Sequence, residues 1–235
     1  MLRAFARTLL SLLPLLWAGS AWGVDPYVAE PAPALAFSEL PKYFSAVLDP
    51  AGVQLSSTLG NKNSALCDIW WRKQVPAQKA SASSQDIAYS GLKPGTFLGV
   101  ISLFTDREDF QHHMLHPGLY TMRYAQLQQD EDDHAISPFR DFVVLTPSWA
   151  DKDPEALVPF EELNKRGILA SHSDEPAVMS LVPVNPSYKI FPWPVADDRG
   201  FCTLQVRLQQ RLDGKVSDLP LALIIVRPMY ENEGS

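Results

Sequence analysis

The sequence predicts an all-β protein: a single antiparallel β-sandwich, of the jelly-roll or immunoglobulin-like type, with one short helix. Roughly eight short stretches alternate apolar and polar residues as half-buried strands do, and turn residues separate them. The 235 residues also include 20 prolines, which interrupt long helices and mark turns. No break in composition and no internal repeat divides the chain, so we expect one domain after the N-terminal segment.

The first 23 residues have the features of a secretory signal peptide. Arg3 and Arg7 precede an apolar stretch at residues 8–18, and residues 21–23 (Ala-Trp-Gly) place small side chains at a cleavage site. The apolar stretch is too short to span a bilayer. We therefore expect residues 1–23 to be removed, leaving a soluble periplasmic or secreted protein with no membrane span.

The charge of the chain limits its partners. The formal net charge is −7 at pH 7, and the lysines and arginines do not form runs in the sequence. Nucleic acids and anionic membranes attract basic segments. We therefore expect no nucleic-acid partner and little attraction to an anionic membrane.

The first half of the mature chain predicts a lead-in followed by strands. Residues 24–51 are proline-rich and aperiodic, which indicates an extended lead-in to a β-sandwich domain at residues 52–230. The domain should begin with strands at 52–60 and 64–75. A small, polar segment at 76–86 should then form a loop.

Two Pro-Gly pairs predict the start of the next two strands, because proline and glycine favour turns. We expect a strand at 96–104 that is apolar on both faces and therefore central. A second strand at 118–128 should have one more exposed face. A loop of about eleven residues should connect it to a strand at 140–147.

One helix is predicted near residues 153–165. Asp153 is suited to cap its N-terminus, and Pro154 suits its first turn. Gly167 stands just past the expected end, where glycine often terminates a helix.

The C-terminal part predicts four further strands. Two short ones are expected at 177–184 and 187–193, and a hairpin is expected in FCTLQVRLQQRL and LPLALIIV. Asp213-Gly214 between them is a strong two-residue turn signal. We expect residues 215–218 to be unpaired, which would make this hairpin longer or irregular.

Cys67 and Cys202 are the two cysteines of the chain. Each belongs to an alternating apolar stretch, so both thiols should point into the core. In an oxidising compartment they could pair, and the bond would stabilise the fold by up to about 5 kcal/mol. The alternative is two buried, unpaired thiols.

The segment QDEDDHAISPFRDF, residues 129–142, contains the first candidate site. The carboxylates of Asp130, Asp132 and Asp133 and the imidazole of His134 are ligand types that metals use. The segment does not match an EF-hand loop, because His134 stands where an oxygen ligand is needed. It therefore predicts either a metal site that includes Asp133 and His134 or a solvated acidic loop.

Arg140 and Asp141 end this segment and raise a second question. Asp141 shares its strand face with apolar residues, and a carboxylate beside a core needs a partner. Arg123, His134 or backbone N–H groups of the loop are the candidates. With His134 as partner, Asp141 would orient a general base, which makes His134, Asp141 and Arg140 candidate catalytic residues. Otherwise the pair is a clamp that anchors the loop.

Three histidines lie close together at His112, His113 and His116. In a helix, His112 and His116 would lie one turn apart on one face and could share a metal with His134 and Asp133. The HExxH pattern is absent, and an exposed turn is the alternative. No P-loop, dinucleotide fingerprint or nucleophile elbow occurs, so a divalent metal is the one cofactor considered.

Residues 117–147, PGLYTMRYAQLQQDEDDHAISPFRDFVVLTP, resemble a group of uncharacterised exported bacterial β-rich proteins. The shared signature is PGxYxxRY…DxDH…SPxRDF. A glycine usually follows the histidine of that pattern, whereas this chain has Ala135 and Ile136. The resemblance implies an exported β-rich architecture and no known activity.

Three classes of function remain open at this point. We favour a non-catalytic protein that binds a small ligand or a partner protein around the 129–141 loop and the adjacent histidine segment. The second class is a metal-dependent enzyme that uses His134 and the His112–His116 segment. The third is a structural component of the cell envelope.

Overall fold

The structure is a computed structural model, and it describes most of the chain after the N-terminus. The described residues are 26–35, 40–59, 63–80, 87–127 and 137–227. The predicted signal peptide at 1–23 lies outside them, as do Asp130, Asp132, Asp133 and His134. The predictions that concern these residues therefore remain predictions.

The described strands form one large sheet and one small hairpin. The strands of the sheet are β1 (Tyr27–Pro31), β2 (Val53–Ser57), β3 (Ser64–Trp71), β4 (Val75–Pro76), β5 (Phe97–Leu103), β8 (Gly118–Gln126), β9 (Asp141–Pro147), β10 (Val178–Val182), β11 (Trp193–Ala196), β12 (Cys202–Leu212) and β13 (Lys215–Val226). The hairpin pairs β6 (Arg107–Glu108) with β7 (Met114–Leu115).

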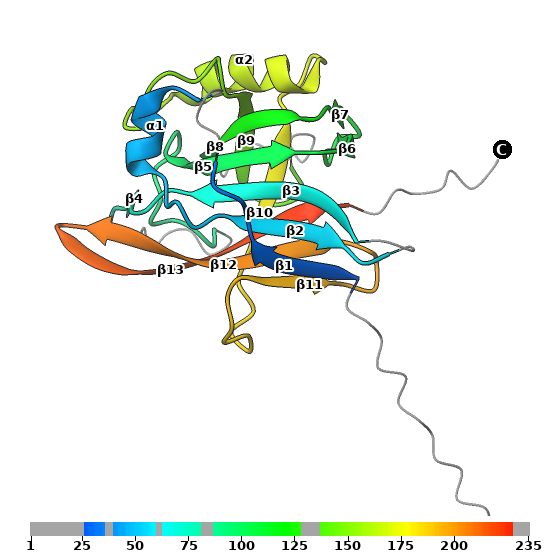
Figure 1. Cartoon of the computed structure of the whole chain (residues 1–235). Coiled ribbons are helices and arrows are strands. Elements are labelled where there is room, and N and C mark those ends of the chain that lie inside the picture. Colours follow the sequence, from blue (N-terminus) through cyan, green and yellow to red (C-terminus); the bar gives the residue numbers. More distant parts are fainter. Residues whose placement is uncertain (1–25, 36–39, 60–62, 81–86, 128–136, 228–235) are drawn as a thin grey trace, which may run out of the picture.

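The large sheet curls until its two ends meet. Its hydrogen-bonded order is β1-β2-β3-β5-β8-β9-β10-β13-β12-β11, and neighbours along this order are antiparallel. β4 adds a short parallel pair beside β12. β1 and β11, at opposite ends of the order, lie next to each other (Figure 1). The fold is therefore mostly β, as predicted, and is built on one curled sheet of mixed strand directions.

Two described helices lie on the outside of the sheet. The sequence predicted one helix. α1 (Lys42–Val47) covers β5 through Phe44, whose ring packs edge-on against Phe97 with 5.1 Å between centroids. α2 (Phe160–Ser171) packs on β9. None of the described helices is long and apolar enough to cross a membrane. α1 and β1 lie within residues 24–51, where an extended lead-in was predicted.

The prediction of a helix at 153–165 was wrong in position. Asp153 caps a local turn, its Oδ1 accepting the N–H of Glu155 at 2.9 Å, and the helix begins at Phe160. Gly167 lies inside the helix and does not end it. A larger residue would not fit there, because a Cβ at this position would approach Val144 and Pro176 closer than 3.0 Å. The glycine serves close packing on β9. His172 takes the left-handed position that ends the helix.

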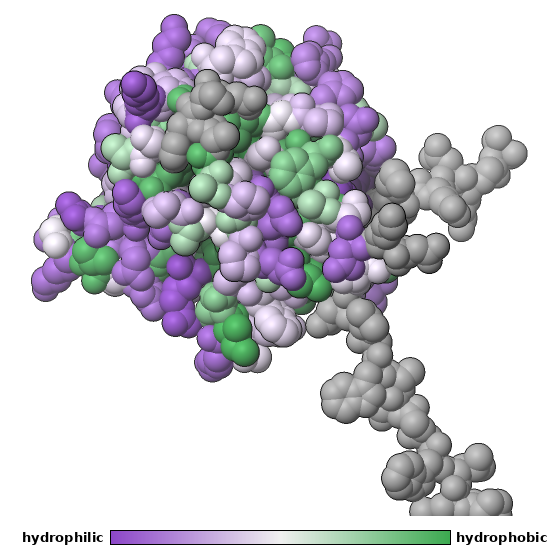
Figure 2. Space-filling model, viewed as in Figure 1, coloured by the Kyte–Doolittle hydropathy of each residue, from purple (hydrophilic) through white to green (hydrophobic). Residues whose placement is uncertain are grey.

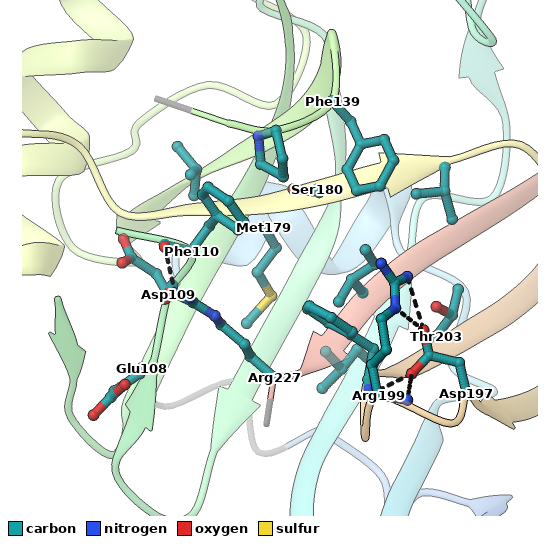
Figure 3. A pocket seen from close by; sticks show the side chains of 16 residues that line it. Glu108, Asp109, Phe110, Phe139, Met179, Ser180, Asp197, Arg199, Thr203 and Arg227 are labelled. Carbon is teal, nitrogen blue, oxygen red and sulfur yellow. Dashed lines mark hydrogen bonds and ion pairs between the residues drawn. The ribbon is translucent and has the colours of Figure 1, made fainter. Parts of the chain in front are cut away.

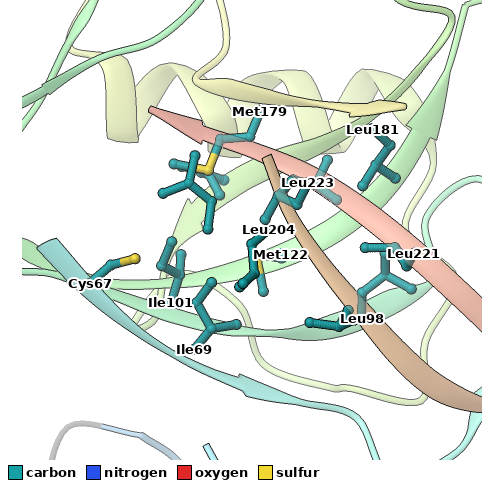
Figure 4. Close-up of a cluster of buried hydrophobic side chains, with 14 of the residues drawn as sticks. Cys67, Ile69, Leu98, Ile101, Met122, Met179, Leu181, Leu204, Leu221 and Leu223 are labelled. Atoms are coloured by element: carbon teal, nitrogen blue, oxygen red, sulfur yellow. The ribbon is translucent and has the colours of Figure 1, made fainter. Parts of the chain in front are cut away.

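The main core fills the inside of the curl. Figure 4 shows side chains of one wall, among them Ile69, Ile101 and Met122, facing Leu204 and Leu221 of the opposite wall. Alternate residues of each strand point inward, which explains the alternating pattern in the sequence. Burying each such side chain contributes about 1.5–3 kcal/mol.

β5 and β8 are buried on both faces. β5 places Leu98 and Ile101 in the inner core and Phe97 and Val100 under α1, and an irregularity between Phe97 and Gly99 accounts for the unequal spacing. Its prediction as a central strand is confirmed. The prediction that one face of β8 is more exposed was wrong, because the segment after β9 covers that face.

The long β12–β13 hairpin turns at Asp213-Gly214, as predicted. Both residues have positive φ angles, 49° and 77°, and Leu212 pairs directly with Lys215. This is the geometry of a two-residue type I′ turn. Residues 215–218 were predicted to be unpaired, but they pair in register with residues 209–212.

The strand predicted at 187–193 is absent from the described structure. Residues 183–192 form a loop of turns and bends, and β11 begins at Trp193. Pro186 and Pro192 interrupt the segment, and neither has an N–H for a sheet hydrogen bond. The loop extends below the sheet in Figure 1, between the end of β10 and the start of β11.

Candidate functional site

A cleft of about 270 Å³ lies beside β10. We call it the β10 cleft, and Figure 3 shows it from close by. Its apolar walls include Phe110, Phe139, Val178, Met179, Phe201 and Ile225. Ligand sites in proteins are mostly concave and apolar with a few placed polar groups, at roughly 300–1,000 Å³. The β10 cleft has this character, and its volume lies just below that range.

The structure brings together at this cleft the two segments that the sequence analysis singled out. Pro138 and Phe139 come from the end of the 129–141 segment, and Glu108 to Phe110 come from the segment just before the histidines. The corner at Pro138 is held over β10 by the hydroxyls of Ser137 and Ser180, 3.1 Å apart. Ser137 Oγ also accepts the N–H of Phe139 at 3.2 Å.

Arg199 lies on one side of the cleft, in a tight turn built around Asp197. Oδ1 of Asp197 accepts the N–H groups of Arg199 and Phe201 at 3.0 and 2.9 Å. The Arg199 guanidinium donates to Oδ2 of Asp197 at 2.9 Å and lies 5.0 Å from the ring centroid of Phe201. The arginine therefore forms part of the cleft with its charge already balanced by Asp197.

Arg227 lies on another side, with Met179 between the two arginines in Figure 3. Its guanidinium is 4.9 Å from the ring centroid of Phe110 and donates to the backbone carbonyls of Asp109 and Phe110. Nη2 of Arg227 is 3.2 Å from Nε2 of His112. The contacts tie the end of β13 to the β6–β7 segment.

Asp109 is a buried acid in the lining, and it serves the local fold. Its Oδ1 accepts the N–H groups of Gln111 and His113, both at 2.9 Å. Burial raises the pKa of the Asp109 carboxyl, and the hydrogen bonds from His113 oppose that rise. Both oxygens are engaged, because Oδ2 lies 3.2 Å from Nδ1 of His113.

Of the predicted metal site, His112 and His116 lie among the described residues, whereas Asp133 and His134 lie outside them. The histidine segment folds back as the β6–β7 hairpin with His112 at a φ of 65°, so the helical spacing of His112 and His116 does not arise. His112 Nδ1 lies 3.2 Å from Glu108, and His116 Nδ1 lies 2.9 Å from Asp106. Within the described part of the chain, no group of three or more His, Cys, Asp or Glu could hold a metal.

Asp141 is a buried structural carboxylate. Its Oδ1 accepts the hydroxyl of Tyr124 at 2.6 Å, and its Oδ2 accepts the N–H of Ala88 at 2.8 Å. Burial raises the pKa of Asp141, and these hydrogen bonds oppose the rise. Arg123, one of the candidate partners, binds Asp151 instead, and Arg140 donates to the carbonyl of Leu127 at 3.0 Å. Of the two predicted roles, these contacts fit the clamp.

Tyr120, Arg123, Tyr124 and Asp141, described residues of the PGxYxxRY and SPxRDF patterns, are part of the scaffold. Arg123 is fully buried, and the buried Tyr124 donates its hydroxyl to Asp141. Tyr120 donates its hydroxyl to the carbonyl of His116 at 2.8 Å. These polar contacts hold β8 and β9 to the loops beside them and do not face the β10 cleft.

Both cysteines are unpaired and buried in the inner core. Burial raises the pKa of the Cys67 thiol to about 12 and raises that of Cys202 as well. A thiol reacts as its thiolate, so neither group is suited to nucleophilic chemistry at neutral pH. The structure therefore corresponds to the unpaired alternative of the sequence analysis.

Sequence reasoning missed the residues that define the cleft, namely Phe110, Phe139, Arg199 and Arg227. One signal was available for Arg199, since Asp-x-x-Gly from Asp197 to Gly200 is a pattern typical of a turn. The others are ordinary aromatic and basic residues whose neighbours are decided by the fold.

No protein-family model, curated protein or solved structure matches this chain. The case for a function therefore depends on the geometry of the molecule and on its sequence. The β10 cleft is the feature of the described structure that bears most directly on binding.

Proposed function

We propose that this is an exported, soluble, non-catalytic protein that binds a small and mainly apolar molecule in the β10 cleft. The observation that carries the proposal is the apolar wall of Phe110, Phe139 and Met179 with two guanidinium groups beside it. Apolar walls supply affinity, and a few placed donors orient the ligand.

The polar groups of the cleft favour a ligand whose polar end accepts hydrogen bonds. Arginine side chains donate and do not accept. Because Asp197 already balances the charge of Arg199, the ligand does not need a full negative charge. A small molecule with a carbonyl or a weakly acidic group at one end of an apolar body fits this combination.

Binding without catalysis is supported by how the reactive side chains are used. Oδ1 of Asp109 accepts two backbone N–H groups, and its Oδ2 lies beside the His113 ring. The hydroxyl of Ser180 is hydrogen-bonded to that of Ser137. A general base or nucleophile needs a free group within reach of the substrate. These groups instead hold the walls of the cleft in place.

Two further parts of the proposal concern location and architecture. Export to the periplasm or the medium is supported by the charged and apolar pattern of residues 1–23. A β-sandwich is the finer description that we propose for the fold, because the two walls of the curled sheet face each other across one core. The resemblance to exported β-rich proteins agrees with both.

Fluorescence of 1-anilinonaphthalene-8-sulfonate tests the cleft. Phe139→Ala removes apolar wall and should weaken binding of this probe by roughly 5- to 30-fold, about 1–2 kcal/mol. Phe104→Ala is the matched control, since Phe104 is 41% exposed against 38% for Phe139 and does not line the cleft. Equal binding by both variants, with unchanged circular dichroism, would show that the probe does not occupy the β10 cleft and would count against the proposal.

A further inference from the structure

Five cations that are distant in the sequence come together on one face of the fold. Two adjoining clefts of about 540 and 550 Å³ share Arg72 and Lys73 at the end of β3. Arg211 of β12 lines the first cleft, and Lys189 and Arg207 line the second. We call these five residues the basic face. Little attraction to an anionic membrane was expected because lysines and arginines do not form runs in the sequence, but the curl of the sheet brings these five residues together.

The acids near the basic face do not balance its charge. Glu155 pairs with Arg72 at 2.6 Å, and Asp218 lies 3.6 Å from Arg207. Asp49, in the second cleft, uses its Oδ1 to accept the N–H of Ala51 at 2.9 Å.

The other three cations have no ion pair with any residue the structure describes. Lys73 and Lys189 donate to the carbonyls of Ala46 and Pro186, at 3.1 and 2.8 Å, and Arg211 donates to the amide oxygen of Gln74. All three are exposed. The face is therefore locally positive on a chain whose formal net charge is −7.

An apolar loop projects beside the basic face. Residues 183–192 extend below the sheet in Figure 1, and Figure 2 shows apolar surface at the same lower edge, surrounded by hydrophilic surface. Ile190 in this loop is 68% exposed. Phe191 lies under the guanidinium of Arg207 at 4.6 Å. Tyr188 and Trp193 stack with 6.3 Å between ring centroids, which supports the base of the loop.

We propose that this face binds reversibly to an anionic phospholipid surface. Ile190 and its loop enter the interfacial region of the bilayer, and Lys73, Lys189 and Arg211 contact the headgroup phosphates. Interfacial binding of this kind combines buried apolar area with attraction of basic residues to anionic lipids. A soluble polyanion would use the cations alone and would leave the exposed isoleucine without a role, so the two features together favour a lipid surface.

Sedimentation with lipid vesicles tests the proposal on the chain from residue 24 onward. The protein should sediment with vesicles of equal parts phosphatidylglycerol and phosphatidylcholine and should not sediment with pure phosphatidylcholine. Lys189→Gln should reduce partitioning about fivefold, since a basic residue near an anionic surface contributes about that factor. Ile190→Ser should reduce it by a similar or larger factor. Added salt should weaken binding because it screens the headgroup charge.

Matched controls come from α2, on the opposite side of the sheet from the loop in Figure 1. Lys165→Gln removes an exposed cation, and Leu169→Ser removes an apolar side chain that is 44% exposed. Both should leave partitioning unchanged, and circular dichroism should confirm that all four variants are folded.

Two results would overturn the proposal. One is equal sedimentation with anionic and neutral vesicles, or with neither. The other is release from anionic vesicles by millimolar inorganic phosphate together with unchanged partitioning of Ile190→Ser, which would make the basic face a site for soluble anions.

Discussion

Asp151→Asn tests the buried ion pair that holds the segment after β9 onto β8. Arg123 and Asp151 are both fully buried at the side chain, and the guanidinium donates to the two carboxylate oxygens at 2.7 and 2.9 Å. The remaining donors of Arg123 reach the backbone carbonyls of Gly95, Asp153 and Ala156. All five N–H groups of the guanidinium are therefore satisfied.

Asparagine keeps the shape of Asp151 but removes the charge that balances Arg123. Breaking a buried pair at one partner costs about 3–5 kcal/mol, because a charge is left buried without compensation. For a chain of this size each kcal/mol lowers the melting temperature by roughly 2–4 °C, so we expect a decrease of about 6–20 °C. Urea denaturation should show the same loss as a lower midpoint with an unchanged slope.

Glu162→Gln is the matched control for this experiment. Glu162 and Asp151 both pair with Arg166, at 2.9 and 3.3 Å, but the Glu162 side chain is 48% exposed. Exposed pairs contribute about 0–1 kcal/mol. A loss in Asp151→Asn no larger than that of Glu162→Gln would refute the reasoning that the Arg123–Asp151 pair anchors the segment.

Two further predictions concern buried groups. Burial raises the pKa of Asp141 above its usual 3.8. Between pH 3.8 and the raised pKa, the folded protein therefore binds more protons than the unfolded chain. The free energy of unfolding should fall as the pH rises through this interval. Urea denaturation between about pH 4 and about pH 7 should show a smaller fall for Asp141→Asn than for the unmodified protein, and identical slopes would contradict this account. Cys67 and Cys202 should resist a thiol reagent in the native state and both react after denaturation without a reductant, whereas a denatured protein with no reactive thiol would reveal a disulfide.

Elements with a local cause could be predicted from the sequence. The Asp213-Gly214 turn was correct because the two residues tolerate the positive φ angles that a type I′ turn requires. The central strand at 96–104 was correct because both of its faces are apolar. These features depend on residues that are neighbours in the sequence.

Elements with a distant cause could not be predicted. One face of β8 was expected to be more exposed, yet Thr121 and Arg123 are fully buried. The segment after β9 covers them, and its Asp151, about thirty residues later, accepts hydrogen bonds from both. Gly167 suggested a helix end, but it is needed for contact with Val144. In each case the contact that explains the residue comes from a part of the chain that is distant in the sequence.

The candidate site was predicted in part for the same reason. The 129–141 segment and the histidine segment attracted attention through their charges, and their flanks do meet at the β10 cleft through Phe139 and Phe110. The metal site assigned to them stays a prediction, because Asp133 and His134 lie outside the described residues. The three histidines of the histidine segment each pair with a separate carboxylate. The aromatic walls gave no signal because a single phenylalanine in a sequence is more often part of a core.

The curled sheet has a consequence for how the chain must mature. The inner faces of β3, β5 and β8 are covered by β12 and β13, which are the last strands of the described chain. A chain that is made or translocated from its N-terminus therefore carries an uncovered apolar wall until residues 202–226 have emerged. Transiently exposed apolar surface and strand edges promote aggregation. We therefore expect correct folding to depend on rapid completion of the C-terminal hairpin or on a chaperone that shields the first wall in the meantime.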